Sequence, residues 1–187
     1  MEYKNQSLAK YLNDLSAKLP APGGGSAAAL NAAMAAGLIS MVINFTLGKP
    51  KYAQYQDELK LILEKSEKLR HEFLNLVDLD VAAYSSKNMR DALNVPLMVA
   101  RLSCEGAKLV LPLVKKGNVN LISDVAVASI LFESAFASAK FNVDINLKSI
   151  ADKNLSVSFK KELTRNENFI KKVRAKTEER VGAIIRG

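Results

Sequence analysis

The stretch of sequence that decides the fold is residues 21–48, APGGGSAAALNAAMAAGLISMVINFTLG, which contains no charged residue. About 20 apolar residues are enough to span a bilayer, so a membrane helix is one interpretation. The stretch is rich in alanine rather than leucine, however, and it includes the polar residues Asn31 and Asn44. This composition favours a central helix that neighbouring helices approach closely, without membrane contact. A helix that is apolar on all sides must be enclosed by protein, and the few other helices expected of this chain do not cover it, which predicts a homodimer.

Outside this stretch the spacing of apolar residues is helical nearly everywhere, without the sustained alternation that is typical of strands. Bends are expected at Pro96 and Pro112, because proline interrupts helical hydrogen bonding. Residues 141–150 are undecided between a short helix and irregular structure. We therefore expect an all-α fold, a single-domain helical bundle over residues 1–187 with a long central Ala-rich helix, that dimerises. The spacing predicts helices over residues 5–18, 26–47, 53–86, 89–115, 123–140 and 156–185.

The composition of the 187-residue chain excludes several functional classes. Cys104 and His71 are the only cysteine and histidine, which excludes a disulfide framework and the usual zinc sites. Cys104 is expected in the core, and His71 at the surface. Of the net charge of +8, +6 falls in residues 153–187, with ten Lys or Arg against four Glu, and the interleaved acids favour a solvated helix face over a nucleic-acid site. Residues 1–13 carry charges and no apolar leader, so a cytoplasmic location is expected.

The motif Pro22-Gly-Gly-Gly-Ser26 is the first candidate site. Three glycines leave backbone N–H groups uncovered, and Ser26 is expected to be the N-cap of the helix that follows. The positive end of the helix dipole favours an anion or a carbonyl oxygen at this position. A flexible turn with an ordinary cap explains the same residues equally well.

Asp80 is the second candidate. At 100° per residue, Asp80 lies about 20° from Phe73 around the helix axis, on the apolar stripe that Val77 and Tyr84 flank. Burial of a carboxylate there raises its pKa unless a cation lies beside it, which suits general acid–base catalysis. A buried structural hydrogen bond or ion pair is the alternative. Asp78 points about 140° away from Phe73 and is expected to face solvent.

Further polar residues gather in the second half of the chain. Asp124 follows Ser123 at an expected helix start, where the helix dipole alone favours an acid. Asn142, Asn146 and Lys148 are interleaved with apolar residues, and amides with an ammonium group can bind a polar heterocycle or a carboxylate. Turn formation is the alternative explanation for this cluster. No constellation of metal ligands is present in the sequence.

Taken in order, these motifs resemble the cyclodeaminase/cyclohydrolase family, which contains the C-terminal domain of formiminotransferase-cyclodeaminase and the stand-alone methenyltetrahydrofolate cyclohydrolases. The resemblance covers residues 7–180 and implies an all-α homodimer with folate bound near the dimer interface. Relatives usually carry a longer connection, including a loop, where this chain has only residues 85–94. The matching motifs are Pro22-Gly-Gly-Gly-Ser26, Val77-Asp78-Leu79-Asp80, Val95-Pro96-Leu97, Gly117-Asn118, Ser123-Asp124, Phe141-Asn142-Val143 and Ile145-Asn146-Leu147-Lys148.

The resemblance implies a one-carbon enzyme, either a methenyltetrahydrofolate cyclohydrolase or a formiminotetrahydrofolate cyclodeaminase. A tetrahydrofolate derivative is then the substrate, and no tightly bound cofactor or metal is expected. Asp80 is expected to be the catalytic proton shuttle. The alternative is a non-catalytic helical dimer that binds a folate or another anion. The residues expected to bind substrate are Gly23, Gly24, Gly25, Ser26, Asp124, Asn142, Asn146 and Lys148.

Overall fold

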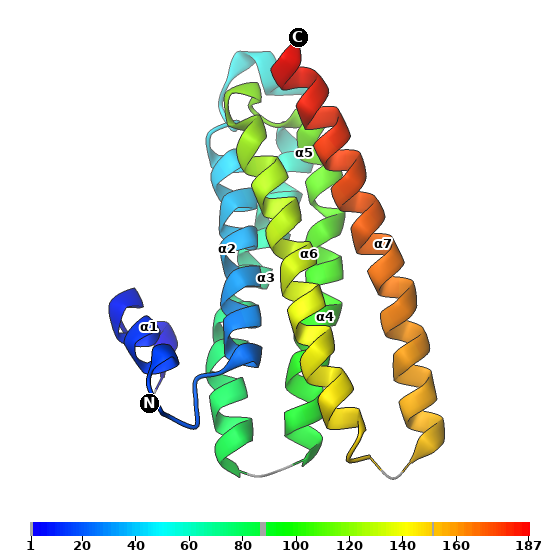
Figure 1. Cartoon of the computed structure of the whole chain (residues 1–187). Helices are drawn as coiled ribbons and strands as arrows, with labels where there is room; N and C mark the ends of the chain where they lie inside the picture. The colour runs from blue at the N-terminus through cyan, green and yellow to red at the C-terminus, as the bar shows by residue number, and fades with distance from the viewer. Residues whose placement is uncertain (1, 87–88, 151) are drawn as a thin grey trace.

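The computed structural model describes residues 2–86, 89–150 and 152–187, and every regular element in these ranges is a helix. This confirms the all-α prediction. Four long helices form a bundle, and α7 runs along one side of it (Figure 1). The elements are η1 (Tyr3–Asn5), α1 (Leu8–Ser16), α2 (Gly24–Asn44), η2 (Pro50–Tyr55), α3 (Gln56–Ser86), α4 (Met89–Lys108), α5 (Val110–Lys116), η3 (Val119–Leu121), α6 (Ile122–Leu147) and α7 (Lys153–Arg186).

The Ala-rich helix α2 packs against α3 on one side and α6 on another, and α4 packs against α6 and α3. The alanines of α2 allow its neighbours to approach closely, and Ala29, Ala32, Ala35 and Ala36 are fully buried. By length and composition alone, Gly24–Asn44 and Val119–Leu147 are each able to cross a membrane. In the bundle, 61% of an apolar 18-residue stretch in the first segment is buried inside the protein, and 39% of such a stretch in the second.

The two prolines of the fourth predicted helix have different effects. The helix passes through Pro96 without a break, but it ends at Lys108 and resumes at Val110 as α5. Pro112 explains this break, because a continuous helix would need a hydrogen bond from residue 112 to the carbonyl of Lys108. The interruption predicted near Pro112 is therefore confirmed, but it is a full break, and the single helix predicted over residues 89–115 is two helices.

The predicted helix ends also needed correction. The undecided residues 141–150 are mostly helical, since α6 continues to Leu147.

The Gly117-Asn118 motif is structural: the Asn118 N–H donates to Thr46 Oγ1 at 2.9 Å, and Asn118 Nδ2 donates to the Phe45 carbonyl at 3.1 Å. These bonds fix the turn after α5 to the end of α2.

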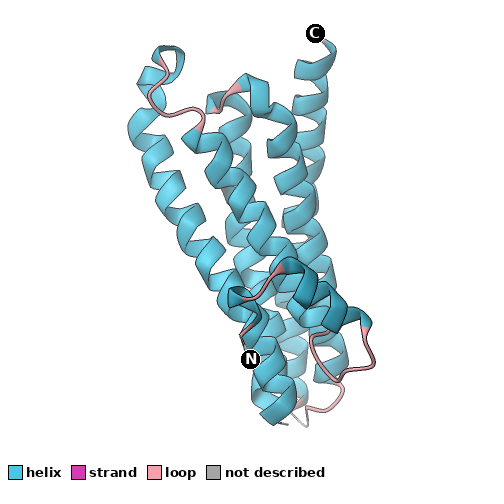
Figure 2. Cartoon of the chain, turned by 90° about the vertical axis from the view of Figure 1, so that its left-hand side faces the viewer, coloured by secondary structure: helices cyan, strands magenta, loops and turns pink. Residues whose placement is uncertain are grey.

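The ends of four helices meet at the end of the bundle that lies away from the turn after α5, which is the lower end in Figure 1. The start of α2, the end of α3, the start of α4 and the end of α6 gather there. The short helix α1 lies outside the bundle beside the start of α2, as the rotated view also shows (Figure 2). This end of the molecule carries most of the candidate site residues.

Candidate active site

A pocket of about 260 Å³ lies where these four helix ends meet. Most of the predicted site residues line it, although they come from three helices that are far apart in sequence. The predicted residues among its lining are Gly23, Gly24, Gly25, Asp80, Asn142 and Asn146. Further lining residues, which the sequence did not single out as binding residues, are Pro20, Ala21, Ala83, Tyr84, Ala92 and Ile145.

Asp80 is held against the first turn of α2. Its Oδ2 accepts a hydrogen bond from the Ser26 N–H at 2.8 Å. A Cβ atom on Gly25 would lie 2.1 Å from Asp80 Oδ1, so only glycine permits this approach of backbone to carboxylate. Burial raises the pKa of Asp80 above its ordinary value, and the Ser26 hydrogen bond partly opposes that rise. Asp80 is thus a half-buried carboxylate that lines a pocket and favours its protonated form more than an exposed aspartate does.

The prediction that Ser26 is the N-cap was wrong. The N-cap is Gly23, which makes no side-chain cap hydrogen bond, and the carboxylate of Asp80 accepts the Ser26 N–H in its place. The Ser26 hydroxyl is fully buried and accepts a hydrogen bond from the Tyr11 hydroxyl at 3.2 Å. Sequence reasoning missed Tyr11, because nothing local to α1 indicates which helix it contacts.

The N–H groups of Gly24 and Gly25 have no hydrogen-bond acceptor among the described residues. Both residues line the pocket, at the positive end of the α2 dipole. They are available to donate to an oxygen or nitrogen atom of a bound molecule.

Two side-chain amides form the opposite wall. Asn142 Nδ2 donates to the carbonyl of Ser138 at 2.9 Å, one turn earlier in α6. Asn146 Nδ2 donates to the carbonyl of Ala92 in α4 at 2.6 Å. Each amide therefore keeps its Oδ1 as an acceptor, and a second Nδ2 hydrogen as a donor, for a ligand.

Asp78 was expected to face solvent, and this was wrong. Its Oδ1 accepts the Tyr3 N–H at 2.5 Å, while its Oδ2 is buried and has no hydrogen-bond partner among the described residues. The N-terminal segment covers it, a tertiary contact that helical angles do not predict. Tyr84, by contrast, shares the stripe of Asp80 but is 61% exposed at the edge of the pocket.

Three predicted binding residues do not line the pocket. Ser26 is buried behind it, and Lys148 is exposed just beyond the end of α6. Asp124 stands in the first turn of α6, about 27 Å along the helix from Asn142. It can reach a ligand in this pocket only if a second copy of the chain carries it there. In the shortened connection, Lys87 lies outside the described residues, and Arg90 is exposed.

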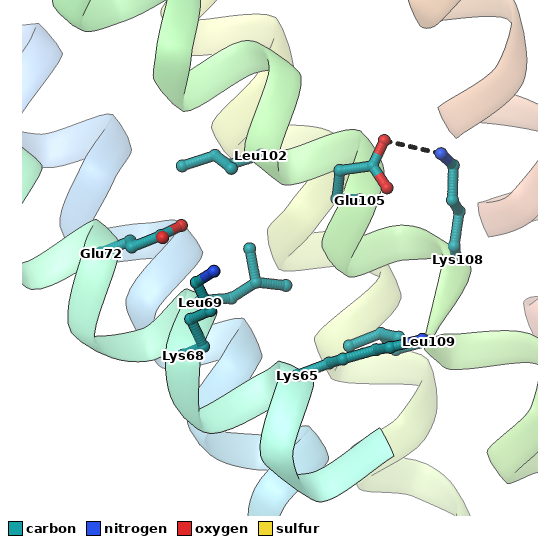
Figure 3. Close-up of a pocket in the computed structure, with 8 residues that line it drawn as sticks. All are labelled: Lys65, Lys68, Leu69, Glu72, Leu102, Glu105, Lys108 and Leu109. Atoms are coloured by element: carbon teal, nitrogen blue, oxygen red, sulfur yellow. Dashed lines mark hydrogen bonds and ion pairs between the residues drawn. The ribbon is translucent and has the colours of Figure 1, made fainter. Parts of the chain in front are cut away.

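A larger cavity of about 410 Å³ lies between α3 and α4 (Figure 3). Its polar lining consists of surface side chains, among them Lys65, Lys68 and Lys108, and Lys108 is paired with Glu105 at 2.6 Å. It contains none of the predicted site residues, so we assign the site to the smaller pocket. Within the described ranges no cluster of three or more His, Cys, Asp or Glu is arranged to hold a metal ion.

Comparison with known proteins identifies the family of the chain. The family model described as formiminotransferase-cyclodeaminase matches residues 7–89 and 86–165, two segments that meet at the shortened connection. The chain is 35% identical to the methenyltetrahydrofolate cyclohydrolase of Methylorubrum extorquens, over 85% of this chain and 88% of that protein.

It is also 28% identical to the formimidoyltransferase-cyclodeaminase of Rattus norvegicus, over 78% of this chain but only 31% of that longer protein. Among solved structures, the formiminotetrahydrofolate cyclodeaminase of Thermotoga maritima superposes with a TM-score of 0.93 at 29% identity, covering 98% of this chain and all of that one. Because the family model spans most of the sequence and the helical bundle is shared, the chain belongs to the formiminotransferase-cyclodeaminase family.

Proposed function

We propose that the chain is a folate one-carbon enzyme, a cyclohydrolase that converts 5,10-methenyltetrahydrofolate and water to 10-formyltetrahydrofolate. The observation that carries this proposal is the half-buried carboxylate of Asp80, which lines a pocket together with free backbone N–H groups and side-chain amides. The named cyclohydrolase, which matches over nearly its whole length, favours this reaction over the related deamination.

The proposed chemistry is proton transfer around one carbon. Water attacks the electrophilic carbon between N5 and N10 while Asp80 accepts a proton from that water. The tetrahedral carbinol then collapses: the C–N5 bond breaks, Asp80 returns its proton to N5, and the hydroxyl proton is released as the formyl C=O forms. A general base is most effective when its pKa lies near the working pH, so the raised pKa of Asp80 suits this role. The reaction requires neither a redox cofactor nor a metal.

The other site residues bind and orient the substrate in this proposal. The Gly23–Gly25 backbone presents N–H donors to the pterin or to the oxygen that develops at the reacting carbon. Asn142 and Asn146 line the opposite wall, and Ser26 holds Asp80 through its N–H. We expect Lys148, which is exposed beyond the end of α6, to attract the carboxylates of the glutamate tail.

A cyclodeaminase is the second candidate, because the structural match and the rat relative carry that name. In that reaction N10 of 5-formiminotetrahydrofolate attacks the formimino carbon, and ammonia leaves after proton transfer. The tetrahedral carbon between N5 and N10 is common to both reactions, so the same carboxylate serves either one.

The test is the absorbance of 5,10-methenyltetrahydrofolate, measured with and without the purified protein at a pH where spontaneous hydrolysis is slow. We expect faster loss of the methenyl band, abolished by Asp80→Asn with unchanged circular dichroism. Near-normal turnover by that variant would reject Asp80 as the shuttle. No acceleration by the wild-type protein, together with ammonia release from 5-formiminotetrahydrofolate, would assign the deaminase instead. Binding of folate without either reaction would identify a non-catalytic relative.

We further propose that two copies pair through a face of α2 and α6 that carries exposed apolar side chains. Met34 on α2 and Val127 and Ile130 on α6 are exposed there, and Asn31 Nδ2 donates to Ser134 Oγ between the two helices. Asp124 lies one turn before Val127 on the same face. If the helices of the two copies run antiparallel across the interface, Asp124 of each copy lies toward the pocket end of the other.

A further inference from the structure

Pro96 lies inside α4, where it removes one backbone hydrogen bond. In a regular helix, the N–H of residue 96 donates to the carbonyl of residue 92. Proline has no N–H, so the Ala92 carbonyl loses its helical partner. The structure shows what replaces it: Asn146 Nδ2 on α6 donates to Ala92 O at 2.6 Å. A proline on one helix thus creates the acceptor for a side chain on another.

This bond determines which atom Asn146 offers to a ligand. Ala92 and Asn146 both line the candidate pocket. Since a carbonyl oxygen only accepts hydrogen bonds, the amide must direct Nδ2 toward Ala92, which leaves Oδ1 as its acceptor. Asn142 is oriented in the same sense, because its Nδ2 donates to Ser138 O. Together with the carboxylate of Asp80 on α3, the two amides on α6 give the pocket three side-chain acceptors from two helices.

We propose that Pro96 is a positioning residue which orients Asn146 so that its Oδ1 accepts an N–H group of the bound ring. The ligand class that fits is a heterocycle with N–H donors on the edge facing α6, as in a reduced 2-amino-4-oxopteridine. This identification of the ligand rests on the proposed function; the orientation of Asn146 by Pro96 does not.

The test is Pro96→Ala, with Pro112→Ala as the matched control. Replacing a proline inside a helix by alanine restores an N–H and raises helix stability, so the variant should unfold at a higher temperature than the wild type. The new N–H competes with Asn146 for Ala92 O, and the Asn146 amide loses its fixed direction. We expect KM for 5,10-methenyltetrahydrofolate to rise about fivefold, as for the loss of one hydrogen bond, with kcat nearly unchanged. Pro112 lines no part of the pocket, so its variant should keep the wild-type KM.

A double-mutant cycle with Asn146→Ala separates this role from a general effect on α4. Adding Pro96→Ala to Asn146→Ala should leave KM unchanged, because the amide that the proline positions is already absent. If Pro96→Ala raises KM equally in both backgrounds, it acts by another route and the proposal is wrong. An unchanged KM in Pro96→Ala, with a raised KM in Asn146→Ala, rejects the proposal as well.

A measurement without ligand keeps the inference independent of the proposed function. The side-chain amide protons of Asn146, followed by NMR, should be protected from solvent exchange in the wild-type protein and lose that protection in Pro96→Ala but not in Pro112→Ala. Unchanged protection in Pro96→Ala would overturn the positioning role. If protection is lost as expected but wild-type protein neither binds nor converts the folate, the proposed function fails while the role of Pro96 stands.

Discussion

At Gly25 the backbone of α2 lies directly against the carboxylate of Asp80, and this single contact links the glycine motif to the proposed chemistry. A Cβ at this position would lie 2.1 Å from Asp80 Oδ1, so Gly25→Ala must displace the carboxylate or the helix start. A displacement of about 1 Å can cost 100-fold in rate, and we expect a loss of that order in kcat. Gly24→Ala is the matched comparison, because its Cβ would meet only Asn142, at 3.6 Å, and should have a much smaller effect. Equal rates for the two variants would contradict the positioning of Asp80 by Gly25.

The raised pKa of Asp80 predicts the pH dependence of turnover. Asp80 acts as the base in its ionised form, so kcat should fall as the pH decreases through the pKa of its carboxyl, and the midpoint should lie above the ordinary aspartate value of about 3.9. A raised folded-state pKa also means that the ionised carboxylate opposes folding above that pKa. Asp80→Asn should therefore unfold at the same or a higher temperature than the wild type at pH 7. Thermal melts and a kcat profile between pH 4 and 8 measure both effects, and a midpoint at or below the ordinary value would exclude Asp80 as the base.

At the residue scale, the sequence predicted Asp80 but not its partner. The angle between Phe73 and Asp80 needs only the helical repeat, and Phe73 is indeed fully buried. The cap supplied by Asp80, the burial of Asp78 and the contact of Tyr11 with Ser26 all depend on which helices meet. No local pattern contains that information.

At the scale of the elements, two glycines inside helices predict opposite stability effects. A Cβ on Gly106 in α4 would lie 2.3 Å from the ring of Phe132 on α6, which is fully buried and has no room to move. Gly106→Ala should lower the free energy of unfolding by about 1–3 kcal/mol through overpacking. A Cβ on Gly182 in α7 would meet only the flexible end of Arg186, at 3.0 Å. Gly182→Ala should raise the free energy of unfolding by about 1 kcal/mol, because alanine has a higher helix propensity than glycine. Urea titrations measure both changes, and changes of the same sign for the two variants would contradict this account of α4–α6 packing.

Helix existence was predictable from the sequence, whereas helix boundaries were less so. The long periodic segments correspond to α2, α3, α6 and α7. Residues 141–150 were undecided because the sequence does not show that Asn146, a polar residue typical of turns, donates a hydrogen bond to the Ala92 carbonyl of α4. Pro96 and Pro112 looked alike as sequence, but among the described residues only Pro96 has a neighbouring amide that satisfies the carbonyl it leaves free.

At the scale of the whole molecule, the face of α2 and α6 is the feature that one chain leaves unexplained. A core helix without charged residues normally has every side covered, yet Met34 is 51% exposed near the middle of α2. Met34 and Ile130 lie on the same side of the Asn31–Ser134 hydrogen bond, so the exposed apolar side chains of the two helices form one surface. A second copy offers a surface of the same chemistry, and two-fold pairing brings like surfaces together.

We therefore expect the wild-type protein to have twice the 20.4 kDa chain mass in light scattering at micromolar concentration. The double variant Met34→Glu/Ile130→Glu should be monomeric, because it places charges in an interface that must exclude water. Leu61→Glu is the matched control, since Leu61 is 59% exposed on α3 and should leave the dimer intact. A monomeric wild type that sediments with phospholipid vesicles would show that lipid, not a second copy, covers this face. The double variant leaves Asp80 and both pocket amides unchanged. If it is a folded monomer that has also lost turnover, the second copy completes the site. Asp124 is then the first residue to substitute in a search for the group that the second copy contributes.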